Sequence, residues 1–573
     1  MQTVTPSTQS RVLSAPSERM RTLLLFAVAA LIGCSLIWFA LAVQRPLANP
    51  DEGRYAEIPR EMLESGDWVT PHLNGIPYFE KPPLQYWATA AVFGVAGTDE
   101  WTTRLWPAIA GLLAVGAVLL TARRVLSPRA GWMAAAVMGS CWGYFLGTQF
   151  VTLDMTLTAF MTGALCAFVV AQDARSDGRA RRRFMQLAWA LCALSVLTKG
   201  VVGIALPMMA LAIYVALTRD LALLRRLHAG TGFLIFLAIA APWFVMAEMR
   251  NPGFADFFFI QEHVMRYLEP SHRRTGPLWY FIPVAVVFLM PWFPAMIAAM
   301  WHERRRLRFT TRPAGFDAQR FAWCSAAAIF LFFSLSSSKL PAYIMPAITA
   351  AALAAAMPLA RRFDASLRHA ARTLVVAGFI VGIAVVPAGR FVKIPMVRDE
   401  LVTGTPWVMI IAVTMVVGGL ISFRLQRRGF RLRALAAVAL SSLLACQAAN
   451  MLAAHVDEYF SAERLIERLA GAESRAPFRP AMPFYSVDMF DHTVPFYLGR
   501  TVTLVHEQGE LAWGIANAPR NYVADMEEFE RRWVGDAEAM AIMTEATYEA
   551  LRGKDLPMRL LDRDGRRVIV ARH

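Results

Sequence analysis

The sequence predicts a polytopic α-helical membrane protein of about 13 transmembrane helices, with a small α/β domain at the C-terminal end of the chain. Hydrophobic residues make up 56% of the 573 residues and charged residues only 18%, which excludes an ordinary soluble protein. Apolar runs of about the 17 to 25 residues that cross a bilayer recur through most of the chain. Basic loops alternate with less basic ones between these runs. Together these observations indicate a multi-pass fold.

The apolar runs give the predicted spans one by one. The first run extends from Arg21 to Val43 and is long enough to cross the bilayer. The predicted spans begin near Thr22, Leu105, Arg129, Met155, Phe184, Val201, Ala229, Pro277, Phe321, Pro341, Ala371, Thr405 and Ala434.

The basic residues of the connecting loops set the expected orientation. Lys and Arg concentrate in the N-terminal tail and in every second loop, and such loops lie on the cytoplasmic side of membranes. We therefore expect the N-terminus inside and the C-terminal domain outside. If the short apolar segment 82–97 crossed, every later basic loop would move to the wrong side. We expect it to form a helix at the outer interface, so that 44–104 is one long external loop.

The chain divides into a predicted transmembrane domain, 1–452, and a predicted α/β domain, 453–573. All the cysteines fall inside apolar runs, which argues against a disulfide framework or a cysteine metal site. The net charge of +15 follows mostly from the basic loops, so we expect no nucleic-acid partner. The α/β domain is expected to contain helices at 458–469 and 525–533 and strands at 483–487, 501–505 and 567–571.

Candidate functional residues gather where the predicted spans meet the outer water boundary. Asp51 and Glu52 follow the first span, and two adjacent carboxylates at a membrane edge are costly to keep there without a purpose. Asp154 opens the fourth span on the same side. A convergence of acids and bases on one face is what a site for anionic substrates requires. The other members of this outer set are Arg54, Glu80, Lys81, Lys199, Glu262, His263, Arg266, Lys339 and Tyr343.

Several of these residues lie in motifs that resemble those of the polyprenyl-phosphate-dependent glycosyltransferases with the GT-C fold. The resemblance is closest to the 4-amino-4-deoxy-L-arabinose lipid A transferase family, relatives of the protein O-mannosyltransferases. It rests on the runs DEGRYAEIPREM at 51–62, GIPYFEKPPL at 75–84 and SKLPAY at 338–343, together with Lys199-Gly200 and Glu262-His263 followed by Arg266.

The resemblance implies a multi-pass enzyme of the bacterial inner membrane, with its active site and C-terminal domain in the periplasm. Such an enzyme takes a sugar from undecaprenyl phosphate and places it on a phosphate of lipid A, which gives resistance to polymyxin and other cationic peptides. Its expected partners are the lipid-linked sugar donor, the lipid A acceptor and the membrane. The resemblance requires no cofactor, and a divalent ion held by Glu80 and His263 is a further expectation.

The chemistry of this transfer assigns a role to each group of residues. Breaking the bond between sugar and phosphate develops negative charge on the departing phosphate, so fixed cations beside it lower the barrier. A carboxylate near the sugar orients the acceptor and stabilises the electron-poor anomeric carbon. Direct displacement of the phosphate would invert that carbon. We expect phosphate binding by Lys81, Arg266, Lys339, Tyr343 and Lys199, catalysis by Asp51, Asp154 and Glu52, and substrate binding by Arg54, Tyr55 and Tyr78.

Each assignment has a structural alternative. Asp51 and Glu52 suit the first turn of a helix, and Asp154 suits a helix N-cap. Arg54 can pair with acids along its own helix, and Lys81 can anchor to lipid headgroups.

Two other functions also fit the sequence. One is a GT-C transferase that uses another lipid-linked sugar or a protein acceptor. The other is a transporter or flippase of lipid-linked substrates, although charges in the middle of the spans are scarce.

Overall fold

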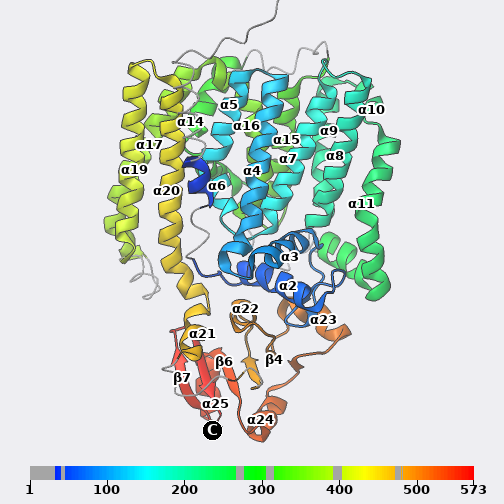
Figure 1. Ribbon diagram of the computed structural model, residues 1–573, viewed down its shortest axis with the longest axis vertical. Helices are drawn as coiled ribbons and strands as arrows, with labels where there is room; N and C mark the ends of the chain where they lie inside the picture. The colour runs from blue at the N-terminus through cyan, green and yellow to red at the C-terminus, as the bar shows by residue number, and fades with distance from the viewer. Residues whose placement is uncertain are drawn as a thin grey trace, which may run out of the picture.

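The computed structural model describes residues 33–39, 45–265, 276–304, 315–391, 403–471, 479 and 482–572. It contains an upright bundle of helices, a thin layer of short helices across one end of the bundle, and an α/β domain beyond that layer (Figure 1). The bundle contains α4 (Glu100–Val125), α5 (Pro128–Ser140), α6 (Trp142–Thr148), α7 (Leu153–Gln172), α8 (Gly178–Lys199), α9 (Val202–Thr218), α11 (Ala229–Arg250), α13 (Phe281–Phe288), α14 (Phe293–Glu303), α15 (Ala318–Leu335), α16 (Met345–Arg361), α17 (Phe363–Phe391), α19 (Thr405–Arg427) and α20 (Arg431–Phe460).

The bundle confirms the polytopic helical fold. Within the described residues, eight helices are long and apolar enough to cross a membrane, and a ninth span arises if α13 and α14, bent by 101°, count as one. Every predicted span after the first falls on or next to one of the bundle helices. The first predicted span lies mostly outside the described residues. Helix α9 is apolar but shorter than the eight helices counted above. The total of about 13 therefore stays a prediction.

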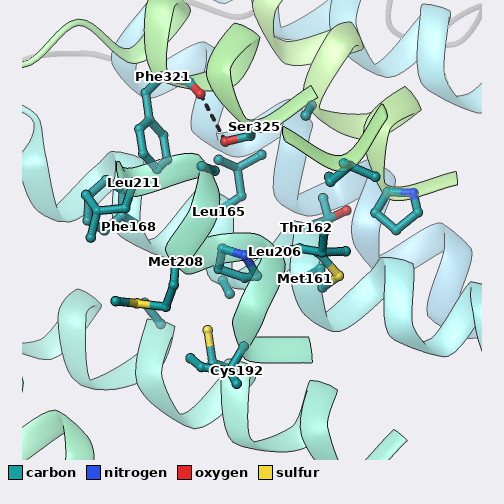
Figure 2. A pocket seen from close by; sticks show the side chains of 18 of the residues that line it. Met161, Thr162, Leu165, Phe168, Cys192, Leu206, Met208, Leu211, Phe321 and Ser325 are labelled. Carbon is teal, nitrogen blue, oxygen red and sulfur yellow. Dashed lines mark hydrogen bonds between the residues drawn. The ribbon is translucent and has the colours of Figure 1, made fainter. Parts of the chain in front are cut away.

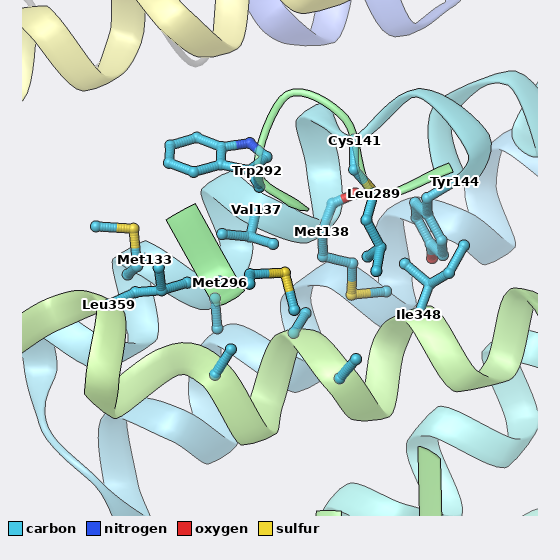
Figure 3. Packing of buried hydrophobic residues seen from close by; sticks show 14 of the residues in the cluster. Met133, Val137, Met138, Cys141, Tyr144, Leu289, Trp292, Met296, Ile348 and Leu359 are labelled. Atoms are coloured by element: carbon cyan, nitrogen blue, oxygen red, sulfur yellow. Dashed lines mark hydrogen bonds between the residues drawn. The ribbon is translucent and has the colours of Figure 1, made fainter. Parts of the chain in front are cut away.

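The centre of the bundle is built around the alanine-rich helix α16. Small residues let neighbouring helix backbones approach closely, which is how helices associate within lipid. Most of α16 is buried, and it packs against α5, α7, α14 and α15. Larger side chains such as Met138, Trp292 and Ile348 fill the remaining space (Figure 3). The Trp292 Nε1 group donates to Ser140 Oγ at 2.9 Å, so the polar edge of this indole is satisfied inside the apolar core.

Two helices of the external loop lie between the bundle and the C-terminal domain: α2 (Asp51–Ser65) and α3 (Leu84–Ala96) (Figure 1). The position of α3 across the end of the bundle agrees with the helix predicted at 82–97. A short antiparallel hairpin, β1 (His72–Leu73) and β2 (Ile76–Pro77), connects them. Its turn residues Asn74 and Gly75 both have positive φ, as a tight hairpin turn requires.

The same turn binds the C-terminal domain. The Asn74 side chain donates to the Val502 carbonyl at 2.8 Å and accepts from the Val502 amide at 2.7 Å. Asn74 is fully buried, and its main-chain amide donates to Glu61. The external loop and the C-terminal domain therefore meet through a fully bonded polar contact.

The C-terminal domain is a six-stranded mixed sheet with helices around it, which confirms the α/β class. The predicted strands at 483–487, 501–505 and 567–571 correspond to β3 (Phe484–Val487), β4 (Thr503–Val505) and β8 (Arg567–Ala571). Three further strands were not predicted from the sequence: β5 (Tyr522–Val523), β6 (Met540–Thr544) and β7 (Arg559–Arg563). The strand order is β5-β4-β3-β6-β8-β7. Its helices are α21 (Glu463–Ala470), α22 (Thr493–Leu498), α23 (Ala512–Asn517), α24 (Met526–Gly535) and α25 (Glu545–Arg552), and α20 continues through residue 452 to Phe460.

A buried ion cluster fixes α2 to the bundle. Both oxygens of Glu52 accept hydrogen bonds from Arg104 of α4, at 3.0 and 2.8 Å, and Arg45 binds the same carboxylate at 3.1 Å. The amides of Ala48 and Val151 donate to it as well, each at 3.1 Å. Burial alone would raise the pKa of Glu52, but Arg104 and Arg45 outweigh it and hold the pKa at about 2.

This arrangement corrects the expected catalytic role of Glu52. Its side chain is 2% exposed, and five donors occupy its oxygens. A carboxylate in this state has no accessible face for a substrate. Glu52 therefore holds the start of α2 in place and is structural.

We expect Glu52→Gln to lower the free energy of unfolding by about 3 to 5 kcal/mol, because it leaves two buried guanidinium groups beside a neutral amide. Denaturant or thermal unfolding of the detergent-solubilised protein measures this loss. Because folding lowers the pKa of Glu52 from 4.5 to about 2, the stabilisation is complete above pH 4.5 and disappears as the pH falls through about 2.

The matched control is Glu64→Gln on the same helix, since the Glu64 side chain is 62% exposed. Its loss should be below about 1 kcal/mol. Equal stability of the Glu52 variant and the wild type would contradict the anchoring role.

Candidate functional site

The site begins at the first residue of α2. The Asp51 side chain is 40% exposed, and its Oδ1 lies 3.4 Å from Arg54 Nη1. Pro50 precedes it and provides no side-chain cap. Consecutive helix residues point about 100° apart, so Glu52 is buried against the bundle while Asp51 stays exposed. Asp51 is therefore the accessible member of the acidic pair.

The C-terminal domain supplies the next residues. Arg54 Nη2 lies 2.6 Å from Glu510 Oε2, and His492 Nε2 lies 2.7 Å from Glu510 Oε1. Burial would raise the pKa of Glu510, but the Arg54 guanidinium outweighs it, and the pKa falls to about 2. Glu510 is thus an ionised carboxylate between two donors from different parts of the chain. Arg54 therefore pairs along its own helix with Asp51, as the structural alternative expected, and also across to the C-terminal domain.

A glycine allows this close approach. A Cβ atom on Gly53 would lie 2.7 Å from the main-chain carbon of His492. Any larger residue at this position would push α2 away from the C-terminal domain.

Three buried tyrosines surround Arg54. Its guanidinium carbon lies 5.7 Å from the ring centre of Tyr55 and 5.9 Å from that of Tyr78. The Tyr55 and Tyr86 rings stack with centres 6.1 Å apart. In the part of the chain that the structure describes, the hydroxyls of Tyr78 and Tyr86 are buried and have no hydrogen-bond partner. Burial raises the pKa of all three phenols, so they are neutral donors.

A second acid and base pair borders this cluster. Lys199, the last residue of α8, lies 2.5 Å from Asp154 Oδ1 at the start of α7. Lys199 Nζ also lies 4.5 Å from the centre of the Tyr343 ring, in the short helix η2 (Pro341–Ile344). The N-cap of α7 is Thr152, so the alternative that Asp154 is an N-cap is wrong. The charges of Asp51, Glu510 and Asp154 all raise the pKa of Tyr55, so the three carboxylates lie near the same phenol.

Lys81 approaches the cluster from the loop before α3. Its ammonium donates to the Glu80 carbonyl at 2.7 Å and lies 3.5 Å from Glu262. The charge of Lys81 also lowers the pKa of Glu510, so the ammonium lies near that carboxylate. Arg266 and the side chain of His263 lie outside the described residues.

Of the two residues predicted to hold a divalent ion, Glu80 and His263, only Glu80 has a described side chain. Glu80 is buried beside Lys81, with 3.7 Å between Glu80 Oε2 and Lys81 Nζ. Among the described residues, no group of three or more His, Cys, Asp or Glu side chains is arranged to hold a metal ion. The divalent ion at Glu80 and His263 stays a prediction.

Lys339 has a different role from the expected one. Its ammonium donates to the carbonyls of Ser334 and Ser336, each at 2.8 Å, and lies 3.4 Å from the Phe333 carbonyl. These carbonyls belong to the last turn of α15 and the residue after it, which have no partners within the helix. Lys339 is 5% exposed and caps α15. We therefore replace its expected phosphate-binding role with a structural one.

The structure thus gathers most of the predicted site. Three segments far apart in the sequence contribute to it: the loop 44–104, the ends of the bundle helices nearest that loop, and the C-terminal domain. Glu510 and His492 were not predicted, because they lie in a domain with no recognisable catalytic motif. The predicted residues that gather are Asp51, Arg54, Tyr55, Tyr78, Glu80, Lys81, Asp154, Lys199 and Tyr343.

An apolar pocket lies in the bundle beside this site (Figure 2). Residues of α7, α8, α9, α15 and α16 line it, and α7 and α8 also carry Asp154 and Lys199. Met161 is seven residues after Asp154 on α7, so the pocket begins about 10 Å from the polar cluster along that helix. It extends to Phe168 and Phe321.

The polar residues of this pocket are internally satisfied. Thr162 donates to Thr349 at 2.7 Å, and Ser325 donates to the Phe321 carbonyl at 2.9 Å. The pocket wall is therefore apolar in character and suited to a hydrocarbon chain.

Each of the two predicted domains of the chain contains a match to a known protein family. Residues 22–258 match the family described as dolichyl-phosphate-mannose-protein mannosyltransferase, and residues 471–572 match the aminoarabinose transferase C-terminal domain. An undecaprenyl phosphate-alpha-4-amino-4-deoxy-L-arabinose arabinosyl transferase from Pseudomonas aeruginosa (strain LESB58) is 30% identical, over 84% of this chain and 87% of its own length. A transferase of the same description from Pseudomonas fluorescens is 29% identical, over 84% and 82%.

Solved structures give the same picture. The crystal structure of ArnT from Cupriavidus metallidurans bound to undecaprenyl phosphate superimposes with a TM-score of 0.86 at 36% identity, covering 96% of this chain and 98% of that one. The archaeal oligosaccharyltransferase AglB from Archaeoglobus fulgidus superimposes with a TM-score of 0.51 at 14% identity, covering 92% and 70%. That second likeness is one of fold alone.

We expect Lys339→Met to lower the free energy of unfolding by about 1 to 3 kcal/mol, since it leaves buried carbonyls without a donor. Thermal unfolding in detergent measures the change. Lys554→Met is the control, because Lys554 makes a surface pair with Glu530 and should cost less than about 1 kcal/mol. Unchanged stability of the Lys339 variant would contradict the structural role and favour the phosphate-binding role.

Proposed function

This chain belongs to the family of undecaprenyl phosphate-α-4-amino-4-deoxy-L-arabinose arabinosyl transferases, and on that premise we propose how its residues carry out the reaction. The enzyme transfers 4-amino-4-deoxy-L-arabinose from undecaprenyl phosphate. We infer that the acceptor is a phosphate of lipid A at the periplasmic face of the inner membrane. One observation carries this proposal: an accessible carboxylate, Asp51, shares one cluster with the cations Arg54, Lys81 and Lys199.

The donor phosphate binds between Lys81 and Lys199 in this proposal. Both ammonium groups are held in place by carboxylates, Lys81 near Glu262 and Lys199 at Asp154. Cations fixed before the reaction stabilise charge that develops in the transition state without reorganisation. Tyr343, against Lys199, completes this part of the site, and Arg266 is proposed to join it.

The sugar lies against Asp51 in the proposed reaction. An oxygen of the acceptor phosphate attacks the anomeric carbon from the side opposite the donor phosphate. The bond between that carbon and the donor oxygen breaks, its electron pair stays on undecaprenyl phosphate, and the configuration inverts. The acceptor is already an anion, so Asp51 orients the reactants and stabilises the electron-poor carbon in place of acting as a strong base.

Neighbouring groups bind the rest of the sugar. Asp154 is the second carboxylate and pairs with the sugar amine in this proposal. Tyr55 and Tyr78 lie against Arg54 and are proposed to form the wall of the sugar site. A cationic sugar on lipid A masks phosphate charge, which weakens the attraction of cationic peptides such as polymyxin.

The apolar pocket of Figure 2 takes the polyprenyl chain in this proposal. The chain is continuous with the phosphate, and the helices α7 and α8 carry both the proposed phosphate site and the pocket wall. A tail in this pocket would bind a long apolar substrate through dispersion and burial alone.

We expect Asp51→Asn to reduce the rate of transfer by about 100-fold or more, since the neutral amide cannot stabilise positive charge on the sugar. Purified enzyme, donor lipid and lipid A, with product followed by mass spectrometry, give the measurement. Glu64→Gln, on the exposed face of the same helix, should keep wild-type activity. Full modification of lipid A by the Asp51 variant would end this assignment.

We expect Met208→Trp to raise the KM for the long-chain donor by about tenfold, because the larger side chain enters the pocket that Met208 lines. A donor with a short prenyl chain should be affected less. Leu234→Trp is the control, since Leu234 is 66% exposed on α11 and outside the pocket. The same KM for long and short donors in the Met208 variant would place the tail elsewhere.

A further inference from the structure

His492 is a buried histidine of the C-terminal domain that touches the site from outside the bundle. It immediately precedes α22, and its side chain is 10% exposed. One ring nitrogen faces Asn49, just before α2, and the other faces Glu510. The Phe490 ring covers it at 4.5 Å between ring centres. The imidazole is thus fixed at the junction of the two parts of the protein.

One ring nitrogen lies against the chain before α2. Asn49 Oδ1 accepts from the His492 main-chain amide at 2.9 Å, which identifies that atom as the oxygen of the Asn49 side chain. The same oxygen lies 3.0 Å from Nδ1 of the ring.

The second ring nitrogen also faces an acceptor. Nε2 lies 2.7 Å from Glu510 Oε1, while the other oxygen of Glu510 binds Arg54 at 2.6 Å. Both ring nitrogens of His492 therefore face side-chain oxygens, one from the chain before α2 and one from the C-terminal domain.

These contacts form a continuous chain that ends at the proposed catalytic acid. Glu510 is held from one side by His492 and from the other by Arg54. The other terminal nitrogen of the Arg54 guanidinium, Nη1, lies 3.4 Å from Asp51 Oδ1. We propose that His492 is a positioning residue of the transferase: its ring fixes Glu510, which holds Arg54 beside Asp51. This inference rests on the proposed role of Asp51.

The proposal gives the C-terminal domain a part in the reaction. Without His492, Glu510 keeps one strong donor and gains freedom to rotate, and the Arg54 guanidinium rotates with it. A displacement of about 1 Å in a catalytic constellation lowers the rate by up to about 100-fold without abolishing substrate binding. The expected signature is a lower kcat at constant KM.

The test compares His492→Phe, Glu510→Gln and the double variant in the purified enzyme. His492→Phe keeps an aromatic ring against Phe490 but removes both hydrogen bonds, and we expect kcat to fall about tenfold with the donor KM within twofold of wild type. His492→Gln, which retains a donor, should recover part of kcat. If both residues act along one chain, the double variant should be no slower than the slower single variant.

His506→Asn is the matched control. His506 is an exposed histidine of the same domain that pairs with Asp488, and its loss should leave kcat unchanged. Should His492→Phe fail to fold, Glu510→Gln and His492→Gln decide the question, since both keep the shape and polarity of the native contact.

Two results separate this inference from the proposed function. The positioning role would be overturned if the His492 variants kept the wild-type kcat. It would also be overturned if the losses of kcat in the two single variants multiplied in the double variant. In either case an inactive Asp51→Asn variant would leave the proposed function intact. An active Asp51→Asn would overturn the proposed function itself. A raised KM with unchanged kcat would also contradict the chain described here, because it would make His492 a binding residue.

Discussion

The buried carboxylate of Glu52 is the interaction on which the geometry of the site depends. Two arginines and two main-chain amides hold it between the chain before α2, the helix α4 and the segment before α7. A helix turns about 100° per residue, so fixing Glu52 against the bundle also fixes the direction of Asp51. One acid of the pair is used to anchor the helix, and the other is thereby presented to the site. The adjacent carboxylates are complementary in function and not interchangeable.

Paired charges also occur in the rest of the site. Arg54, Lys81 and Lys199 each lie beside a carboxylate, so the cluster is electrostatically satisfied at the edge of an apolar bundle. A phosphate ligand would then enter a set of cations whose positions are already fixed, while the apolar pocket below receives its hydrocarbon. The C-terminal domain closes this arrangement through Glu510 and through the contact of Asn74 with Val502.

The sequence predicted the parts that depend on composition and local pattern. Span-length apolar runs located the bundle helices, and loop charges identified segment 82–97 as a helix outside the bundle. Strand β6 was missed because it is buried and reads as a short continuous apolar run instead of an alternating one. The roles of Glu52 and Lys339 depend on which way a side chain points. His492 and Glu510 reach the site only through contacts between distant parts of the chain, which no local pattern records.

We propose that one cluster, at the end of the bundle that meets the C-terminal domain, holds the donor phosphate beside Asp51. The decisive measurement is a structure of the enzyme with the lipid-linked sugar bound. We expect phosphate oxygens within about 3 Å of Lys81 Nζ and Lys199 Nζ, with the sugar between that phosphate and Asp51. A phosphate bound at the opposite end of the bundle, or a sugar remote from Asp51, would contradict it.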